Sequence, residues 1–166
     1  MVALTRTPST RNPATPATGS PERSGPAKSR PVMLVTFDVP FVSGAAELAV
    51  DAAVESGQAL LVVNAARIEL GPITLAMKYE YFGTQEVEEA LARPAELARE
   101  LSVEVRRLRV CSPRPVDALL EIVREHRPAL LVVGPDPAKM RRRAYRNAVR
   151  KIRDGADCLL WFAAAE

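Results

Sequence analysis

The sequence is poor in cysteine, histidine and aromatic residues. Of its 166 residues, two are Cys, one is His and 5% are aromatic. The two cysteines, Cys111 and Cys158, are too few for a disulfide framework and lack the clustered spacing of a zinc site. This cysteine usage favours a reducing compartment. We therefore expect a cytoplasmic protein without a bound metal.

Long apolar runs and the motifs of several enzyme classes are also absent. No apolar run approaches the roughly 18 residues that a membrane crossing needs, and the first residues show no signal-peptide pattern. No Gly-x-Gly-x-x-Gly follows the first predicted strand, where dinucleotide enzymes carry it. The single histidine, His126, has no nucleophile in a pattern typical of acyl transfer. We expect no membrane partner and no enzyme activity, with a weak ATPase as the open alternative.

The net charge of +3 is unevenly distributed along the chain. Residues 1–31 hold five basic residues (Lys or Arg) and one acidic residue (Asp or Glu). Residues 32–166 hold eighteen basic and nineteen acidic residues. The first segment also contains six of the fourteen prolines and, after Leu4, no large apolar side chain. Such a segment cannot bury enough surface to offset its ordering entropy. We predict a disordered tail at 1–31 and one almost neutral α/β domain at 32–166.

Five short apolar or β-branched runs that end in turn formers predict buried strands. They are residues 32–37, 59–63, 103–110, 129–133 and 158–163. The third run carries Arg106, Arg107 and Arg109, and charge of this kind protects an exposed sheet edge. We therefore place it at the border of the sheet.

Segments with helical periodicity separate these strands. They are residues 43–57, 84–101, 115–126 and 139–153. Ser43 and Thr84 are expected to cap the first two helices, and Pro94 should kink the second or restart it. Strict alternation of strand and helix predicts a parallel sheet with right-handed crossovers. The aromatic-rich excursion at 67–84 should pack on its own domain, with a lid or a subunit contact as alternatives.

This layout resembles the universal stress protein (UspA-like) family. The resemblance covers Val32 to about Ala163 and rests on the element order, on VTFD at the first strand and on LLVVG at the fourth. It implies a doubly wound five-stranded parallel sheet of order 3-2-1-4-5 with helices on both faces. It also implies that Asp38 and Gly134 lie side by side at the switch point of the sheet, with Asp38 at the base or the ribose of an adenine nucleotide.

Nucleotide-binding members of that family carry Gly-x-x-Gly, nine residues, then Gly followed by Ser or Thr. Glycine lets backbone amides reach phosphate oxygens, and the hydroxyl adds a further donor. Counted from Gly134, the second glycine position is Pro137, the third is Asn147 and the hydroxyl position is Ala148. If the register slips by one residue, the third glycine position is Arg146 and the hydroxyl position is Asn147. Only the first glycine is kept, so we expect ATP binding to be lost or altered, and the cofactor to be none, ATP or AMP.

The leading hypothesis is a non-catalytic stress-response or regulatory protein that acts through dimerisation. The candidate nucleotide-binding residues are Asp38, Val63, Gly134, Asp136, Arg141, Arg142 and Asn147. As an alternative, Arg141 to Arg143 replace the missing amides in a nucleotide-binding switch or weak ATPase. As a further alternative, residues 139–153, with eight Lys or Arg and no acid, bind nucleic acid or an acidic partner. A solvated outer face is the plainest interpretation of that segment, and a turn or helix cap is the plainest for Asp38.

Overall fold

The computed structural model of the chain describes residues 30–68 and 84–163. Five parallel strands form one sheet of order β3-β2-β1-β4-β5, which confirms the predicted fold class. The strands are β1 (Val32–Thr36), β2 (Leu60–Arg67), β3 (Val105–Ser112), β4 (Leu130–Val133) and β5 (Leu159–Phe162). Nearly all of the predicted tail at 1–31 and of the excursion at 67–84 lies outside the described residues.

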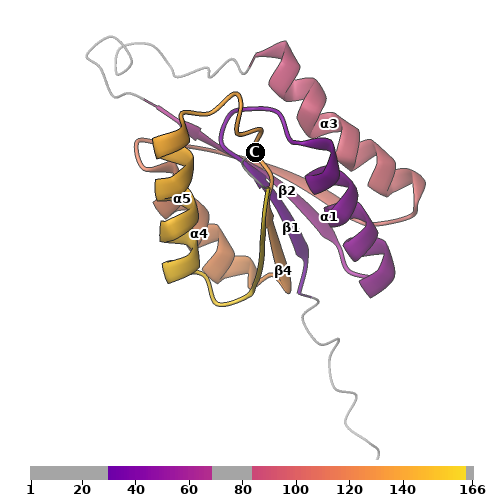
Figure 1. Cartoon of the computed structure of the whole chain (residues 1–166). Helices are drawn as coiled ribbons and strands as arrows, with labels where there is room; N and C mark the ends of the chain where they lie inside the picture. Colours follow the sequence, from indigo (N-terminus) through magenta and orange to yellow (C-terminus); the bar gives the residue numbers. More distant parts are fainter. Residues whose placement is uncertain (1–29, 69–83, 164–166) are drawn as a thin grey trace, which may run out of the picture.

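Four helices cover the two faces of the sheet in the described part of the chain. They are α1 (Ser43–Ser56), α3 (Gln85–Glu100), α4 (Pro115–His126) and α5 (Arg142–Gly155). Figure 1 shows α1 and α3 on one side of the sheet and α4 and α5 on the other. None of these helices has both the length and the apolar character that a membrane crossing needs.

The core lies on both faces of the three central strands. All five residues of β1 are buried, and so are seven of the eight residues of β2. Leu34, Val62 and Val132 pack towards α1 and α3, whereas Met33, Val63 and Val133 pack towards α4 and α5. Two-sided burial is the reason why these strands have continuous apolar runs without polar alternation.

β3 lies at the border of the sheet, as its arginines predicted. Four of its eight residues are exposed and none is buried, and Arg107 forms an ion pair with Glu88 of α3 at 3.7 Å. Arg109 also pairs with Glu88. Charged side chains therefore line this edge and discourage pairing with another chain.

Several predicted boundaries and one predicted cap are wrong. Ser43 is the first residue of α1 and does not cap it, because Val42 occupies the N-cap position without a side-chain bond. Thr84 does cap α3, since its side chain accepts a hydrogen bond from the Val87 amide. The expected restart at Pro94 does not occur, because α3 continues through it and buries the proline. Burial of the Pro94 ring against the domain compensates for the backbone hydrogen bond that proline cannot donate.

The last helix begins three residues later than predicted. Lys139 and Arg141 precede it, and Arg141 is its N-cap residue without a side-chain capping bond. Two prolines, Pro135 and Pro137, delay the start because each fixes a turn conformation. The second and third strands also run further than predicted, to Arg67 and Ser112.

The phenol of Tyr145 attaches α5 to the end of the sheet. Tyr145 is 5% exposed, and its hydroxyl donates to the carbonyl of Ala163 at 2.5 Å. The Ala163 amide in turn donates to Val133 of β4 at 2.9 Å. Burial raises the pKa of Tyr145 above its ordinary value of 10.0, and the nearby Arg153 partly opposes that rise.

Tyr145→Phe should lower the free energy of unfolding by about 1 kcal/mol, because it leaves a buried carbonyl without its donor. The raised pKa means that the unfolded chain releases this proton first, so the stabilisation is complete below pH 10.0 and is lost above it. Urea unfolding at rising pH should therefore show the two proteins converge above that value. A constant difference across this range would contradict the assigned hydrogen bond.

Candidate functional site

The carboxyl ends of β1, β2 and β4 form the edge where parallel sheets of this type bind ligands. Asp38 follows β1 and has a positive φ of 58°. Its amide donates to Oδ1 of Asn64 at 2.8 Å, and Nδ2 of Asn64 donates to its carboxylate at 3.5 Å. Asn64 belongs to β2 and is fully buried. The Asp38 carboxylate is thus oriented by a strand neighbour and caps neither the turn nor α1.

The turn after β4 has no free backbone donor between residues 134 and 139. The amide of Gly134 donates to the Val35 carbonyl at 3.0 Å, and that of Asp136 donates to the Pro40 carbonyl at 2.8 Å. Positions 135 and 137 are prolines and have no amide hydrogen. The amides of Ala138 and Lys139 both donate to Asp136, one to its side chain and one to its carbonyl. A phosphate therefore finds no amide to bind in this turn.

The loop after β1 crosses over this turn and holds it in place. Phe41 and Pro135 form an antiparallel bridge, and the Val42 amide donates to the Gly134 carbonyl at 3.0 Å. These contacts join residues 40–42 to residues 134–136. The Gly134 carbonyl and the Asp136 amide, at the carboxyl end of β4, are therefore bonded to the loop after β1.

Gly134 has a packing role in this arrangement. A Cβ atom at this position would lie 2.3 Å from Cβ of Ala45 in α1, which is far inside van der Waals contact. Its φ does not require glycine. Helix α1 comes so close to the end of β4 that no side chain fits between them.

A cavity of about 710 Å³ opens on the other face of the sheet, between β2, α4 and α5. Asp38 and Asn147 line it, so the structure brings together two of the predicted site residues. The remaining lining residues are Phe37, Ala65, Arg67, Arg114, Pro115, Val116, Asp117, Met140, Ala144, Ala148 and Lys151. The cavity has an apolar floor and a charged rim, a combination that suits a small organic molecule with a polar group.

Three cations at the rim of this cavity were not among the candidate nucleotide-binding residues predicted from the sequence, although Lys151 belongs to the predicted basic segment 139–153. Arg67 ends β2, Arg114 is the N-cap residue of α4, and Lys151 lies on α5. Nζ of Lys151 is 2.5 Å from Oδ1 of Asp117. The available signal was Arg114 directly before the predicted helix at 115–126, whereas Arg67 lies four residues beyond the predicted end of the second strand at residue 63. Only the fold shows that both residues face one cavity.

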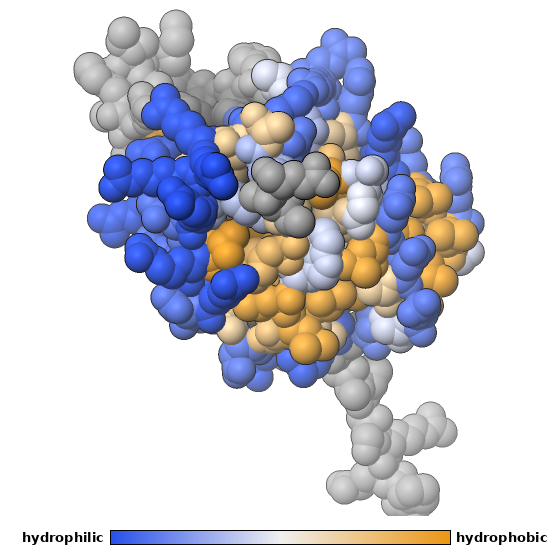
Figure 2. All heavy atoms as spheres, in the orientation of Figure 1, coloured by the Kyte–Doolittle hydropathy of each residue, from blue (hydrophilic) through white to orange (hydrophobic). Residues whose placement is uncertain are grey.

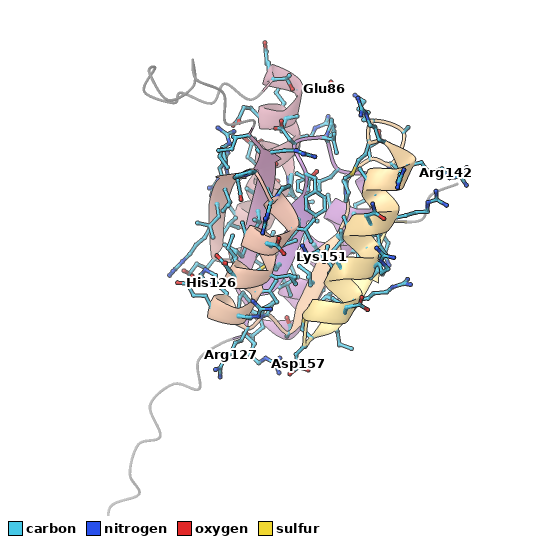
Figure 3. All side chains as sticks on the ribbon, turned by 90° about the vertical axis from the view of Figure 1, so that its left-hand side faces the viewer. Glu86, His126, Arg127, Arg142, Lys151 and Asp157 are labelled. Carbon is cyan, nitrogen blue, oxygen red and sulfur yellow. The ribbon has the colours of Figure 1, made fainter. Side chains whose placement is uncertain are left out.

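The other predicted site residues lie away from this cavity. Val63 is fully buried in the core, and Gly134 is buried behind the turn. The Asp136 side chain accepts the Ala138 amide. Arg141 is exposed at the start of α5, and Arg142 lines a groove of about 500 Å³ on a different side of that helix. Figure 3 shows Arg142 pointing away from α4, whereas Lys151 lies between α4 and α5.

Neither cysteine has the environment of a reactive thiol. Burial raises the pKa of Cys111 and of Cys158, and a nearby arginine only partly opposes each rise. A thiol with a raised pKa is mostly protonated at neutral pH and is a poor nucleophile. No three His, Cys, Asp or Glu side chains within residues 30–68 and 84–163 are grouped so that they could hold a metal ion.

The fold is that of universal stress proteins. No protein-family model matches the chain, and no curated protein matches it. A universal stress protein from Archaeoglobus fulgidus in complex with dAMP is similar in structure, with a TM-score of 0.58, 14% identity, and coverage of 82% of this chain and 98% of that chain. A universal stress protein in complex with cAMP is also similar, with a TM-score of 0.54 and 18% identity. That match covers 84% of this chain and 100% of the other chain.

Gly134→Ala should lower the free energy of unfolding by about 1 to 3 kcal/mol, because the new methyl group overlaps Ala45. In an Ala45→Gly background the same substitution should cost clearly less, since the overlapping atom is gone. Thermal or urea unfolding of the four proteins of this double-mutant cycle measures the coupling.

Gly44→Ala is the matched control, because a Cβ at Gly44 would meet nothing within 4 Å. It should be neutral or stabilise the protein by up to about 1 kcal/mol. Equal costs for Gly134→Ala in both backgrounds would contradict the packing role of Gly134.

Proposed function

We propose that this chain is a non-catalytic, cytoplasmic regulatory or stress-response protein that acts by association and has lost the ATP-binding mode of nucleotide-binding universal stress proteins. The observation that supports it is the turn at residues 134–139, where every amide is bonded internally or replaced by proline. A triphosphate needs several such donors at once. Without them, the stress-protein frame keeps its shape and loses its principal phosphate contact.

An adenine-nucleotide switch, or a weak ATPase, is the second candidate function. The cavity beside Asp38 favours it, because Met140 and Ala144 place the first turn of α5 at the wall of this cavity. A base could rest on the apolar floor and accept or donate bonds at Asp38 and Asn147. The phosphates would then lie near the uncapped start of α5, with Arg141 and Arg143 as counterions.

ATP should not bind at micromolar concentration, because the 134–139 turn offers no backbone donor. Isothermal titration calorimetry with ATP and with AMP measures this directly, and native mass spectrometry of the freshly purified protein detects any retained nucleotide. The titrations should show no binding heat, and the mass spectrum should show protein without bound nucleotide.

Saturable micromolar binding of either nucleotide would contradict the proposal and support the second candidate. In that case Asp38→Ala should weaken binding by about tenfold or more, since it removes a hydrogen-bond acceptor in the cavity. Asp51→Ala, which removes an exposed carboxylate of α1 outside the cavity lining, is the matched control and should leave nucleotide binding unchanged.

The association is proposed to include a homodimer formed through β5. This strand ends the sheet, and its four residues, Leu159 to Phe162, are apolar. Leu159 is 73% exposed. In contrast to β3, no charged side chain interrupts this edge, so a second copy can pair with it in the antiparallel sense about a twofold axis.

Such a dimer brings like charges together. A twofold axis perpendicular to the sheet keeps both copies of α5 on one face. Arg153 of α5 lies 5.1 Å from the ring centre of Phe162 in β5, and Arg142 and Arg146 line the same groove as Arg153. The apolar strands favour association while these arginines oppose it. The electrostatic contribution is therefore repulsive and is reduced by salt.

Dimer affinity should consequently rise when the ionic strength increases from about 0.05 M to about 0.5 M, because the Debye length shrinks well below the separation of the charges. Sedimentation equilibrium at several salt concentrations measures it. Leu159→Arg should abolish the dimer at every salt concentration. A monomer throughout, or an affinity that falls with salt, would contradict the β5 dimer.

A further inference from the structure

One side of α5 carries a stripe of arginines. The helix buries Tyr145, Ala148 and Ile152 against the domain. With about 3.6 residues per turn, its arginines fall within an arc of about 100° that points away from these buried side chains. Figure 2 shows hydrophilic side chains gathered over α5, at the left of the view. The stripe, here called the arginine face, consists of five exposed residues: Arg142, Arg143, Arg146, Arg150 and Arg153.

The charge of the arginine face is not neutralised within the described part of the chain. Lys151, on another side of α5, pairs with Asp117 of α4. By contrast, the five arginines form no ion pair with any described residue, and neither does Arg141 directly before the helix. The single acid of α5 is Asp154, at the end of the helix away from Arg141. The whole side of the helix therefore presents unpaired positive charge.

The arginines are placed where they disfavour the helix that carries them. Arg142, Arg146 and Arg150 follow one another at a spacing of four residues, at which like charges repel. Arg141 and Arg143 lie with Arg142 at the start of α5, where the helix dipole is positive. The first turn contains no acid, and the N-cap position has no side-chain hydrogen bond. Anionic groups that bind along this side relieve both conflicts together.

The opposite side of the domain is acidic. α1 contains no Lys or Arg, and Glu47, Asp51 and Glu55 are exposed at a spacing of four residues along it. α1 and α5 cover opposite faces of the sheet (Figure 1). The nearly neutral domain thus has one positive and one negative side, so a polyanion is attracted to α5 and repelled by α1.

The composition of the arginine face favours a phosphate backbone as its ligand. Its arc contains no apolar or aromatic side chain, so it lacks the apolar centre of a protein interface and the stacking groups of a single-strand binder. Tyr145 and Ile152 are buried in the domain and are not available to insert into a membrane. A duplex backbone needs only cations, which is all that this face offers.

We propose that the arginine face binds the phosphate backbone of double-stranded DNA without preference for sequence. Arg142 to Arg153 span about 16 Å of helix, which is the axial length of about five base pairs. Guanidinium groups bind phosphate with two parallel hydrogen bonds. The face has no amide or hydroxyl side chain for contacts to base edges or to the 2′-hydroxyl of RNA.

This inference goes beyond the proposed function and does not depend on the β5 dimer. A single copy of the chain carries the complete arginine face. The edge of β5 remains available to a second copy, because DNA binds the helix and not the strand.

The test uses the full-length protein and a fluorescein-labelled DNA duplex of about 20 base pairs, about four times the length of the arginine face. Fluorescence anisotropy should show saturable binding at about 0.05 M salt that weakens steeply as salt is added. The slope of the logarithm of the binding constant against the logarithm of the salt concentration should be about −4 to −5, since five phosphate contacts release counterions. An affinity that does not change with salt would overturn the inference.

The combined variant Arg143→Ala, Arg146→Ala, Arg150→Ala should bind at least about tenfold more weakly at low salt, and its salt slope should be smaller by about three. Alanine is a good helix former, and the substitutions remove like-charge repulsion, so thermal unfolding should show a folded protein. The matched control removes three exposed arginines of α3 and β3 and changes the net charge equally: Arg93→Ala, Arg99→Ala and Arg106→Ala. It should bind as the wild type does.

Unchanged affinity of the α5 variant, or an equal loss in the control variant, would overturn the inference. Two duplexes of unrelated sequence should bind alike, and a difference of more than about tenfold would contradict recognition of the backbone. Tighter binding of duplex RNA or of single-stranded DNA would overturn the inference in favour of that ligand. Tighter binding of poly-glutamate would overturn it in favour of an acidic protein.

Failure of the proposed function is measured separately from failure of this inference. Micromolar ATP binding in the nucleotide titration would contradict the loss of the phosphate-binding turn without changing the DNA result. A monomer in sedimentation equilibrium would contradict the β5 dimer and leave the arginine face intact.

Discussion

The structure depends on the close approach of α1 to the end of β4. The missing side chain at Gly134 lets Ala45 come so near that a Cβ would lie 2.3 Å away. This approach lets the loop after β1 run across the turn after β4, where the Val42 amide bonds the Gly134 carbonyl. The two central strands are thereby closed at their carboxyl ends by a backbone clasp. This clasp uses the amides of Gly134 and Asp136 and the carbonyl of Gly134 for bonds within the chain.

The clasp gives the glycine after β4 a different role from that of a glycine in a phosphate-binding turn. In a phosphate-binding turn, glycine serves to expose amides to the ligand. Here the glycine serves helix packing, and the amides on either side of two prolines bond to the chain itself. The same residue at the same position can therefore support two different functions. What distinguishes them is the partner of each N–H group, which sets how strongly an anion is bound.

The domain has almost no net charge, but its arginines have different surroundings at the two borders of the sheet. Arginines on β3 have acidic partners on α3 and so protect one edge of the sheet. Arg142, Arg146 and Arg150 of α5 have no such partners among the described residues. Arg153 of the same helix lies over the Phe162 ring of the apolar strand β5. One border of the sheet is thus lined by arginines paired with α3, while the strand at the other border, β5, consists of apolar residues.

The sequence by itself determined the fold and its borders. Continuous apolar runs specify strands buried on both faces, strict alternation with helices specifies a parallel sheet, and the arginines of 103–110 specify an edge, because these signals come from local periodicity and composition. It also showed that the glycine motif was incomplete. Only the tertiary structure decided the role of Gly134, the pairing of Asp38 with Asn64, the cavity that joins Arg67, Arg114 and Lys151, and the side of α5 to which each arginine belongs. These features depend on distances of a few ångströms between segments far apart in the chain, and no local pattern encodes such distances.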